Sequence, residues 1–355
     1  SEWPFCNAQA DSLLCCGVQV NFGSKQMKRW HLTELLKVML ALSIVTWLLA
    51  SGRIDLYAIR YILRPESLLI SWGAVFISYI LVSARWQKLL ASQEILVSFR
   101  DAFRLSLIGG FFSFVLPGGV SGDAIKAYYV SRDAEQKRWS ALVSVVVDRY
   151  IGVFSLCGVA LVAAYLSDGP AADRAALASI RTFLTLIFAF IAVSGFFVFS
   201  PFRYAQAGRW IQKLDIRVGE KARLFFDALH SYGRSQGTLF HAMVLSVVGH
   251  AVIVCLFVHM AEKMGEFLPL SLYFHCVPIA LMLTAIPIAP GGIGVGQAAF
   301  YFIFNLYLGR QSDLGPTLIT VYQLILFSYG LVGAYFYLKI KERVKGASLE
   351  ATSQN

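Results

Sequence analysis

The sequence predicts an all-α polytopic membrane protein with two inverted-topology repeats, each made of two spans, a broken re-entrant helix pair and a further span. Hydrophobic residues make up 57% of the 355 residues and charged residues only 15%, whereas an ordinary soluble domain carries about 25% charge. Several apolar runs approach the roughly 20 residues that cross a hydrocarbon core. These runs lack the polar–apolar alternation of barrel strands, which excludes a transmembrane β-barrel.

The apolar runs set the order of the predicted elements, with about six full spans and two re-entrant hairpins. The unbroken runs lie at 35–51, 67–84, 139–165, 181–200, 239–260 and 316–338, and two regions interrupted by Pro-Gly-Gly lie at 103–131 and 270–308. Residues 33–165 then form the first repeat and 166–338 the second. We expect a disordered N-terminal extension at 1–32 and a basic C-terminal tail at 339–355.

The distribution of Lys and Arg predicts the orientation in the membrane. If both interrupted regions return to the side they enter from, the segments on one side hold 22 Lys and Arg residues and those on the other side hold 7. Basic residues concentrate in cytoplasmic loops, so both termini and an amphipathic segment at 201–238 are predicted to be cytoplasmic. Two ordinary spans in each interrupted region would give the same sidedness, and that alternative stays open. The net charge of +10 is explained by this anchoring and does not predict nucleic-acid binding.

The two interruptions are related to each other. FVLPGGVSGDA at 114–124 and IPIAPGGIGVGQA at 286–298 share Pro-Gly-Gly and a further glycine, and their prolines, Pro117 and Pro290, lie 173 residues apart. The flanking spans recur at about the same distance. Inverted repeats with interrupted helices are typical of transport folds and place the substrate near the membrane midplane.

The first interruption predicts a site for an anionic group. Its hinge residues are Pro117, Gly118, Gly119 and Gly122. Proline lacks a donor and glycine reaches positive φ, so these residues end one half-helix and let another start. A half-helix that begins near Ser121 points its free N–H groups and its positive end into the cavity. Asp123 then lies in the first turn and Lys126 on the same face, either as a cap with a salt bridge or as a carboxylate that orients Lys126 toward a head group.

Asp148 and Arg149, within LVSVVVDRYIGVFSL, are the next candidates, because an ionisable residue inside a span is costly and marks function. Arg149 can bind a phosphate through two hydrogen bonds. Its structural alternative is an ion pair with Asp123 or Asp148. In the second repeat the corresponding place holds Tyr322 and Gln323, and Gln323 is a further candidate for substrate binding.

The second interruption carries no charge. Its hinge residues are Pro290, Gly291, Gly292 and Gly294, and Gln297 follows as a candidate hydrogen-bonding group. The sequence GGIGVG is a weak dinucleotide fingerprint, and it follows an apolar helix instead of a strand, so we reject that interpretation. We therefore expect the anionic part of a substrate to meet the first interruption.

No cofactor and no metal is predicted. The six histidines and six cysteines show no metal-ligand spacing. There is no P-loop, so ATP hydrolysis by the chain alone is not expected.

Three ordered motifs, LPGGVSGDAIK, VVVDRYIGVFSL and IPIAPGGIGVGQ, resemble the transmembrane module of bacterial lysylphosphatidylglycerol synthases and its stand-alone relatives, over roughly residues 33–340. The resemblance implies a flippase-like fold in the bacterial cytoplasmic membrane that moves a lipid with a charged or glycosylated head group between leaflets. It places the family's site on the candidate positions named above. The aminoacyl-transferase domain of the full-length synthases is expected to be absent, because a short tail follows residue 338.

The sequence departs from the family's pattern at three candidate positions. Lys126 stands where the family often has arginine, and Asp148 and Gln297 stand where glutamate is frequent. The change at Gln297 removes a titratable group and weakens the case for proton coupling there.

The predicted function is translocation of a lipid without an enzymatic step. The lipid is expected to be a phospholipid, an aminoacyl-phospholipid, a hopanoid or a polyprenyl-phosphate-linked sugar. Two alternatives stay open. One is a membrane-embedded transferase with a lipid-linked donor, for which Asp123 and Asp148 are the candidate carboxylates, and the other is a secondary transporter of a small solute.

Overall fold

The computed structural model describes residues 46, 60, 62, 64–116, 121–133, 137–166, 174–199, 216–286 and 289–353. All regular secondary structure in these ranges is helical, which confirms the predicted all-α class. The elements are α3 (Pro65–Ala91), α4 (Phe99–Val115), α5 (Ser121–Asp133), α6 (Arg138–Leu166), α7 (Arg174–Phe199), α9 (Ile216–Arg234), α10 (Gln236–Lys263), α11 (Leu270–Thr284), η3 (Pro290–Gly292), α12 (Val295–Leu308) and α13 (Leu314–Ser353).

Six of the described helices are long and apolar enough to cross a membrane. They are Pro65–Ala91, Arg138–Leu166, Ala178–Phe199, Gln236–Lys263, Pro290–Leu308 and Leu314–Ile340. Five of them correspond to predicted unbroken runs, and the sixth belongs to the second interrupted region. The predicted run 35–51 and the predicted extension 1–32 lie outside the described residues. The chain is therefore a multi-pass membrane protein, as predicted.

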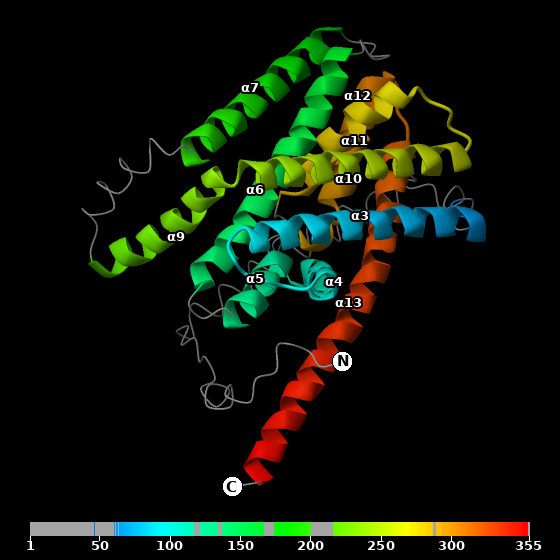
Figure 1. Ribbon diagram of the computed structural model, residues 1–355. Helices are drawn as coiled ribbons and strands as arrows, with labels where there is room; N and C mark the ends of the chain where they lie inside the picture. The colour runs from blue at the N-terminus through cyan, green and yellow to red at the C-terminus, as the bar shows by residue number, and fades with distance from the viewer. Residues whose placement is uncertain are drawn as a thin grey trace, which may run out of the picture.

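Helices α3 and α10 pack side by side and cross α6 and α13 (Figure 1). Near the start of α3, Ser67 Oγ lies 3.1 Å from His259 Nε2. Near the end of α3, Arg85 donates a hydrogen bond to Ser246 Oγ. The order of these contacts shows that the two helices run antiparallel.

Small residues bring α4 and α13 into close contact. A Cβ added at Gly333 of α13 would overlap the carbonyl oxygen of Leu107, and one added at Gly330 would lie 3.4 Å from the Cα of Phe111. Such residues let helix backbones approach closely within a membrane. The order of the contacts makes α4 and α13 antiparallel as well, and α11 packs on α6 elsewhere in the bundle.

Each interrupted region forms two helices that pack on each other, α4 on α5 and α11 on α12. The predicted hinge residues Pro117, Gly118 and Gly119 lie outside the described residues. In the second region the chain turns through η3 and the following loop. Positive φ angles occur at Gly291 (59°), Gly292 (68°) and Gly294 (82°), which is backbone that glycine adopts far more readily than other residues.

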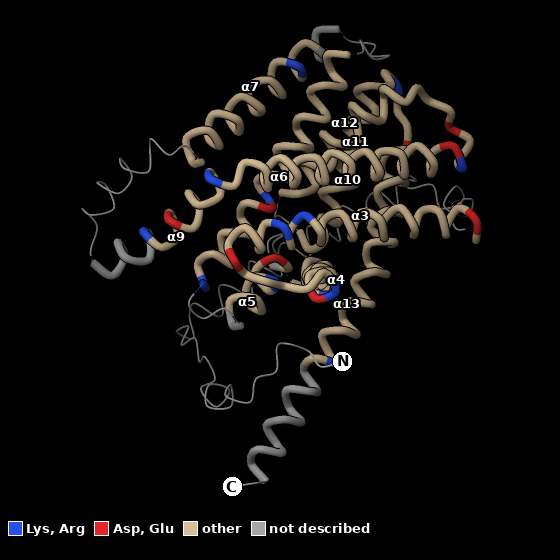
Figure 2. Tube along the Cα trace, viewed as in Figure 1, with Lys and Arg blue, Asp and Glu red and all other residues tan. Residues whose placement is uncertain are grey.

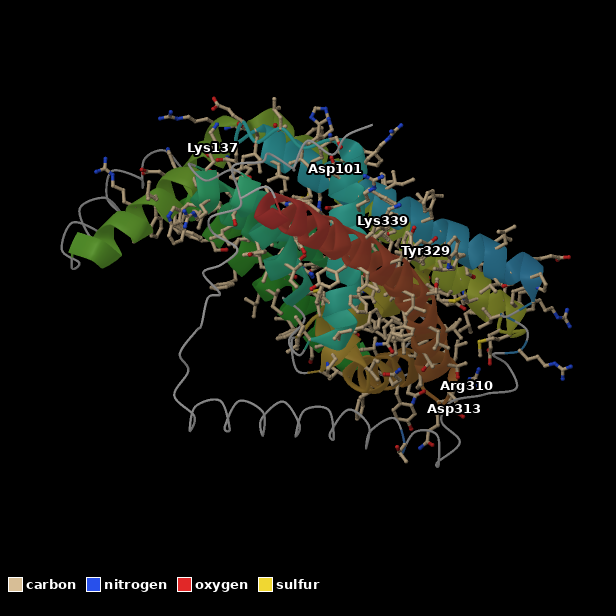
Figure 3. The ribbon with its side chains drawn as sticks, turned by 90° about the horizontal axis from the view of Figure 1, so that it is seen from below. Asp101, Lys137, Arg310, Asp313, Tyr329 and Lys339 are labelled. Carbon is tan, nitrogen blue, oxygen red and sulfur yellow. The ribbon has the colours of Figure 1, made fainter. Side chains whose placement is uncertain are left out.

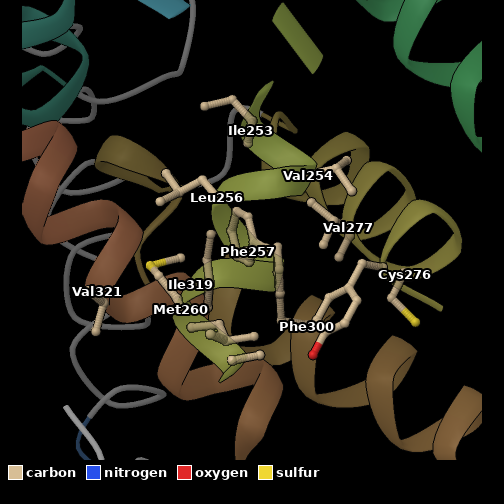
Figure 4. Packing of buried hydrophobic residues seen from close by; sticks show 14 of the residues in the cluster. Ile253, Val254, Leu256, Phe257, Met260, Cys276, Val277, Phe300, Ile319 and Val321 are labelled. Carbon is tan, nitrogen blue, oxygen red and sulfur yellow. The ribbon is translucent and has the colours of Figure 1, made fainter. Parts of the chain in front are cut away.

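Two hydrophobic clusters form most of the core, one mainly within each predicted repeat. The larger cluster joins α10, α11, α12 and α13 (Figure 4), and in it the rings of Phe257 and Phe300 stack with centroids 5.2 Å apart. The second joins α3, α4, α5 and α6 around Trp86, Leu105 and Ala141. Each half of the chain therefore has a core of its own.

Helix α9 is amphipathic and packs on α6 and α7. Tyr232 on its inner face is fully buried and donates a hydrogen bond to the carbonyl oxygen of Leu89 at 3.0 Å. Leu224 and Phe226 on its outer face are exposed. This helix covers part of the predicted amphipathic segment 201–238, of which 201–215 lies outside the described residues.

Two basic residues that the charge count assigned to loops are buried within helices instead. Arg85 belongs to α3 and is 6% exposed, and Lys126 belongs to α5 and is 5% exposed. They were assigned to loops because each follows the end of an apolar run, although the helical pattern continues through it. The segment 339–353, predicted as part of a tail, likewise continues α13.

The tight crossing of α4 and α13 predicts a stability effect. Gly333→Ala places a methyl group on the Leu107 carbonyl oxygen, and such overpacking costs about 1–3 kcal/mol. We expect the thermal unfolding temperature in detergent to fall by about 5 °C. Gly73→Ala in α3 is the matched control, because nothing lies within 4 Å of a Cβ at that position. Equal unfolding temperatures for the two variants would contradict the close crossing.

Candidate functional site

A charged cluster lies at the start of α5, next to the first interruption. Asp123 Oδ1 lies 2.8 Å from Lys126 Nζ, and the other carboxylate oxygen accepts a hydrogen bond from Arg149 Nε on α6. Asp123 is 4% exposed, and a charge so deeply buried is stable only when it is paired. Figure 2 shows acidic and basic positions close together where α3, α5 and α6 meet. Three of the predicted site residues therefore form one ion-pair network.

Packing fixes the position of Lys126. Its Nζ lies 5.0 Å from the centroid of the Trp86 ring, within the range of a cation–π interaction. Its stem passes Gly109 of α4, where an added Cβ would lie 3.2 Å from Lys126 Cγ. The predicted hinge residue Gly122 lies against the Gly109 carbonyl group, so α4 and α5 cross with their backbones in contact. Trp86 Nε1 in turn donates to Ser144 Oγ at 3.2 Å.

Arg149 is the accessible member of the cluster. Its side chain is 51% exposed, whereas that of its partner Asp123 is 5% exposed. The bond to Asp123 uses Nε, and the terminal nitrogens of Arg149 make no hydrogen bond to the described part of the chain. A guanidinium group presents its donors as a fork that matches phosphate or carboxylate oxygens. Arg149 is therefore the residue of this cluster that can reach a ligand.

Asp148, the neighbour of Arg149 in α6, is held by Arg85. Arg85 Nε lies 2.7 Å from Asp148 Oδ1 and Arg85 Nη2 lies 2.9 Å from Asp148 Oδ2, while Nη1 bonds to Ser246 Oγ. The contacts tie α3, α6 and α10 together. Both oxygens of Asp148, a predicted substrate-binding residue, are thus engaged with the protein.

Sequence reasoning missed Arg85. The available signal was the spacing of Trp86, Leu89 and Leu90, which continues a helical apolar face beyond the end of the run 67–84. All three are fully buried.

The turn of the second interruption is held by hydrogen bonds of side-chain amides instead of by ion pairs. The Gly294 N–H group donates to Gln297 Oε1 at 2.7 Å, and Gln297 Nε2 donates to Gln323 Oε1 at 2.7 Å. Gln323 Nε2 completes the network by donating to the Gly291 carbonyl oxygen at 3.2 Å. The two predicted glutamines therefore lie together and clamp the turn.

The two interruptions also touch each other. The Phe114 ring, at the end of α4, packs on Gly291, where any Cβ would overlap it. The same ring meets Phe327 of α13 edge-on, with centroids 5.6 Å apart. The end of α4 and the turn of the second interruption are therefore in direct contact.

One of the membrane histidines, His250, links two helices through its ring. His250 Nε2 lies 3.1 Å from both the Gly152 carbonyl oxygen and Ser155 Oγ, which joins α10 to α6. Across the described ranges, no three His, Cys, Asp or Glu side chains gather in a way that could hold a metal ion.

The Arg85–Asp148 pair predicts a second stability effect. Arg85→Met or Asp148→Leu alone leaves one buried charge unpaired, which costs about 3–5 kcal/mol. The double variant removes both charges, so we expect it to recover most of the thermal stability in detergent. Arg310→Gln is the control, because its pair with Glu266 at 3.4 Å is exposed. A double variant no more stable than the worse single variant would contradict this account.

The family comparison agrees with this architecture. The family described as the lysylphosphatidylglycerol synthase TM region matches residues 35–333, which include every candidate site residue. No curated protein and no solved structure matches the chain. Because the match covers most of the sequence, the chain belongs to the lysylphosphatidylglycerol synthase transmembrane-region family.

Proposed function

We propose that the chain moves a lipid with a charged or glycosylated head group between the leaflets of the bacterial cytoplasmic membrane. The observation that carries this proposal is the environment of the Arg149 guanidinium. Its Nε bonds to Asp123, and about half of the side chain is exposed. It lies beside the N-terminal end of α5, where free N–H groups also favour an anion. The head group would bind there while the lipid tails stay in the bilayer.

Corresponding residue pairs support an inverted repeat. Asp123 on α5 bonds to Arg149 on α6, 26 residues later, and Gln297 on α12 bonds to Gln323 on α13, also 26 residues later. The helix packing corresponds as well, since α4 lies on α13 as α11 lies on α6. A two-fold axis between the antiparallel helices α3 and α10 would relate the two halves, as in inverted-repeat transporters.

Helix lengths support re-entrant hairpins. Helices α4 and α5 have 17 and 13 residues, or about 26 and 20 Å at 1.5 Å per residue. Helix α11 has 15 residues and α12 has 14. Taken alone, α5, α11 and α12 are shorter than the roughly 30 Å hydrocarbon core, although α12 together with η3 reaches the length of a span. Irregular backbone at membrane depth is tolerated where it lines a cavity or is buried in protein.

The positions of polar residues support the proposed sidedness. Figure 3 places Asp101 and Lys137, from segments predicted to be cytoplasmic, at one end of the bundle. Arg310 and Asp313, from a loop predicted to be external, lie at the other end. In this orientation α4 and α5 open toward the cytoplasm, and α11 and α12 open toward the outside.

Transport then proceeds by alternating exposure of the head-group site. The contact between Phe114 and Gly291 couples the two turns, so that opening on one side accompanies closing on the other. The charged cluster binds the head group, and the neutral Gln297–Gln323 pair offers no fixed charge that would retain it. Weaker binding of the head group by the second half would allow its release.

We propose that no covalent step is involved. A transferase needs a carboxylate that is free to act as a base. Both oxygens of Asp123 and both oxygens of Asp148 are engaged in ion pairs, so neither carboxylate is free in this arrangement. The same engagement explains how these charges are tolerated within the membrane.

Liposome reconstitution tests the proposal. Lipids labelled on an acyl chain are incorporated with the protein, and the outer-leaflet label is bleached with dithionite. We expect bleaching beyond the outer-leaflet fraction with wild-type protein. Arg149→Gln removes a charged hydrogen-bond donor worth about 1.5–3 kcal/mol, so it should slow movement by about tenfold or more.

The matched control is Arg223→Gln on α9, whose side chain is 74% exposed, and it should move lipid at the wild-type rate. Wild-type protein that does not exceed empty liposomes, with phospholipids and with polyprenyl-phosphate sugars, would refute the translocase. Turnover of a lipid-linked sugar that Asp123→Asn abolishes would establish a transferase instead.

A further inference from the structure

We infer that the site selects lipids whose head group carries a net negative charge through a phosphate, and that it disfavours head groups with an added ammonium group. This inference rests on the proposed translocation and names its substrate class. Its basis is the charge balance of the buried network at the start of α5.

The network contains one positive charge in excess. Asp123 pairs with Lys126 and Arg149, and Asp148 pairs with Arg85. Three cations therefore face two carboxylates. Within the described ranges, no further acidic side chain forms an ion pair with any of these three cations.

The two ion-pair sets lie next to each other. Asp148 and Arg149 are adjacent in α6. Arg85 is adjacent to Trp86, and the Lys126 ammonium group makes a cation–π contact with the Trp86 ring. The excess charge thus belongs to a single region in which α3, α5 and α6 meet.

An excess positive charge beside buried ion pairs favours the approach of a counter-charge. Lys126 and Arg85 are 5% and 6% exposed, so neither can approach a ligand without leaving its partners. The Arg149 side chain is half exposed, and its terminal nitrogens make no hydrogen bond to the described part of the chain. An incoming phosphate would meet Arg149 and neutralise the whole network.

The same network offers nothing to an ammonium group. All four oxygens of Asp123 and Asp148 already accept from a cation. The second interruption provides the amides of Gln297 and Gln323, which bond to each other and to the turn. A cationic head group would therefore bring a like charge to a site that is already positive, which disfavours binding.

The test compares head groups of different charge in one assay. Wild-type protein is reconstituted in phosphatidylcholine liposomes with an acyl-chain-labelled tracer of phosphatidylglycerol (net −1), phosphatidylethanolamine (neutral) or lysylphosphatidylglycerol (net +1). We expect phosphatidylglycerol to move fastest and lysylphosphatidylglycerol to move slowest, with about a tenfold difference between them. Equal rates, or a faster lysyl lipid, would overturn the inference and leave the translocase intact.

Two variants connect the preference to the network. Lys126→Gln makes the network neutral and keeps the Asp123–Arg149 pair, so the rate ratio of phosphatidylglycerol to lysylphosphatidylglycerol should fall by about threefold or more. Lys126→Arg keeps the charge and should keep the ratio. Arg223→Gln removes the same charge from the surface of α9 and should leave the ratio unchanged, whereas a fall in this control would assign the preference to net protein charge.

A binding measurement separates this inference from the proposed function. Native mass spectrometry of the protein in detergent, with phosphatidylglycerol and lysylphosphatidylglycerol at equal concentration, reports which lipid is retained. Retention of phosphatidylglycerol by a protein that moves no lipid would support the site and refute the translocase. Equal retention would refute the site. Adding a polyprenyl phosphate distinguishes a diacyl carrier from a prenyl carrier of the same anionic chemistry.

Discussion

The Asp123 carboxylate is the contact on which the arrangement of the first half depends. It is one anion between two cations, Lys126 on its own helix and Arg149 on α6. Neither cation forms a second ion pair within the described residues, so this group holds α5 against α6 together with the apolar residues that the two helices share in the second cluster. The close backbone crossing of Gly109 and Gly122 then places α4 in the same unit. A short helix with little apolar surface of its own is thereby held at a defined depth and angle.

In both halves a helix that follows an interruption is bonded to the next span, but the bonding groups differ. In each, the half-helix after the interruption bonds to the following span through side chains 26 residues apart. One bond is an ion pair with an exposed guanidinium, and the other is a closed network of amides. The bonded positions correspond while the charges do not, so in the proposed alternating mechanism the fold would supply the symmetry and the side chains the polarity.

Much of the fold could be predicted from the sequence, because apolar length and loop charge reflect physical constraints that act locally. The spans at 67–84, 139–165, 239–260 and 316–338 all lie within observed helices. The pair of Asp123 and Lys126 followed from helical spacing, and the pair of Arg149 with Asp123 was one of the two ion pairs that the sequence left open. The partner of Asp148 could not be found in this way. Arg85 is 63 residues distant, and only the packing of α3 on α6 brings the two together. Its position after an apolar run resembled that of a loop anchor.

Adjacent residues of α6 perform opposite tasks, and the geometry of a helix explains how. Side chains at consecutive positions point about 100° apart, so Asp148 faces α3 and α10 while Arg149 faces α5. Both carboxylate oxygens of Asp148 accept hydrogen bonds from Arg85, and these bonds fix that side of α6 against α3. Arg149 shares a single nitrogen with Asp123 and keeps the rest of its donors available. A ligand on the terminal nitrogens of Arg149, as proposed, would share the guanidinium group with Asp123, which also pairs with Lys126 on α5. The proposed ligand would therefore bind next to the ion pairs that join α5 to α6, and the Arg85–Asp148 pair lies on another face of α6.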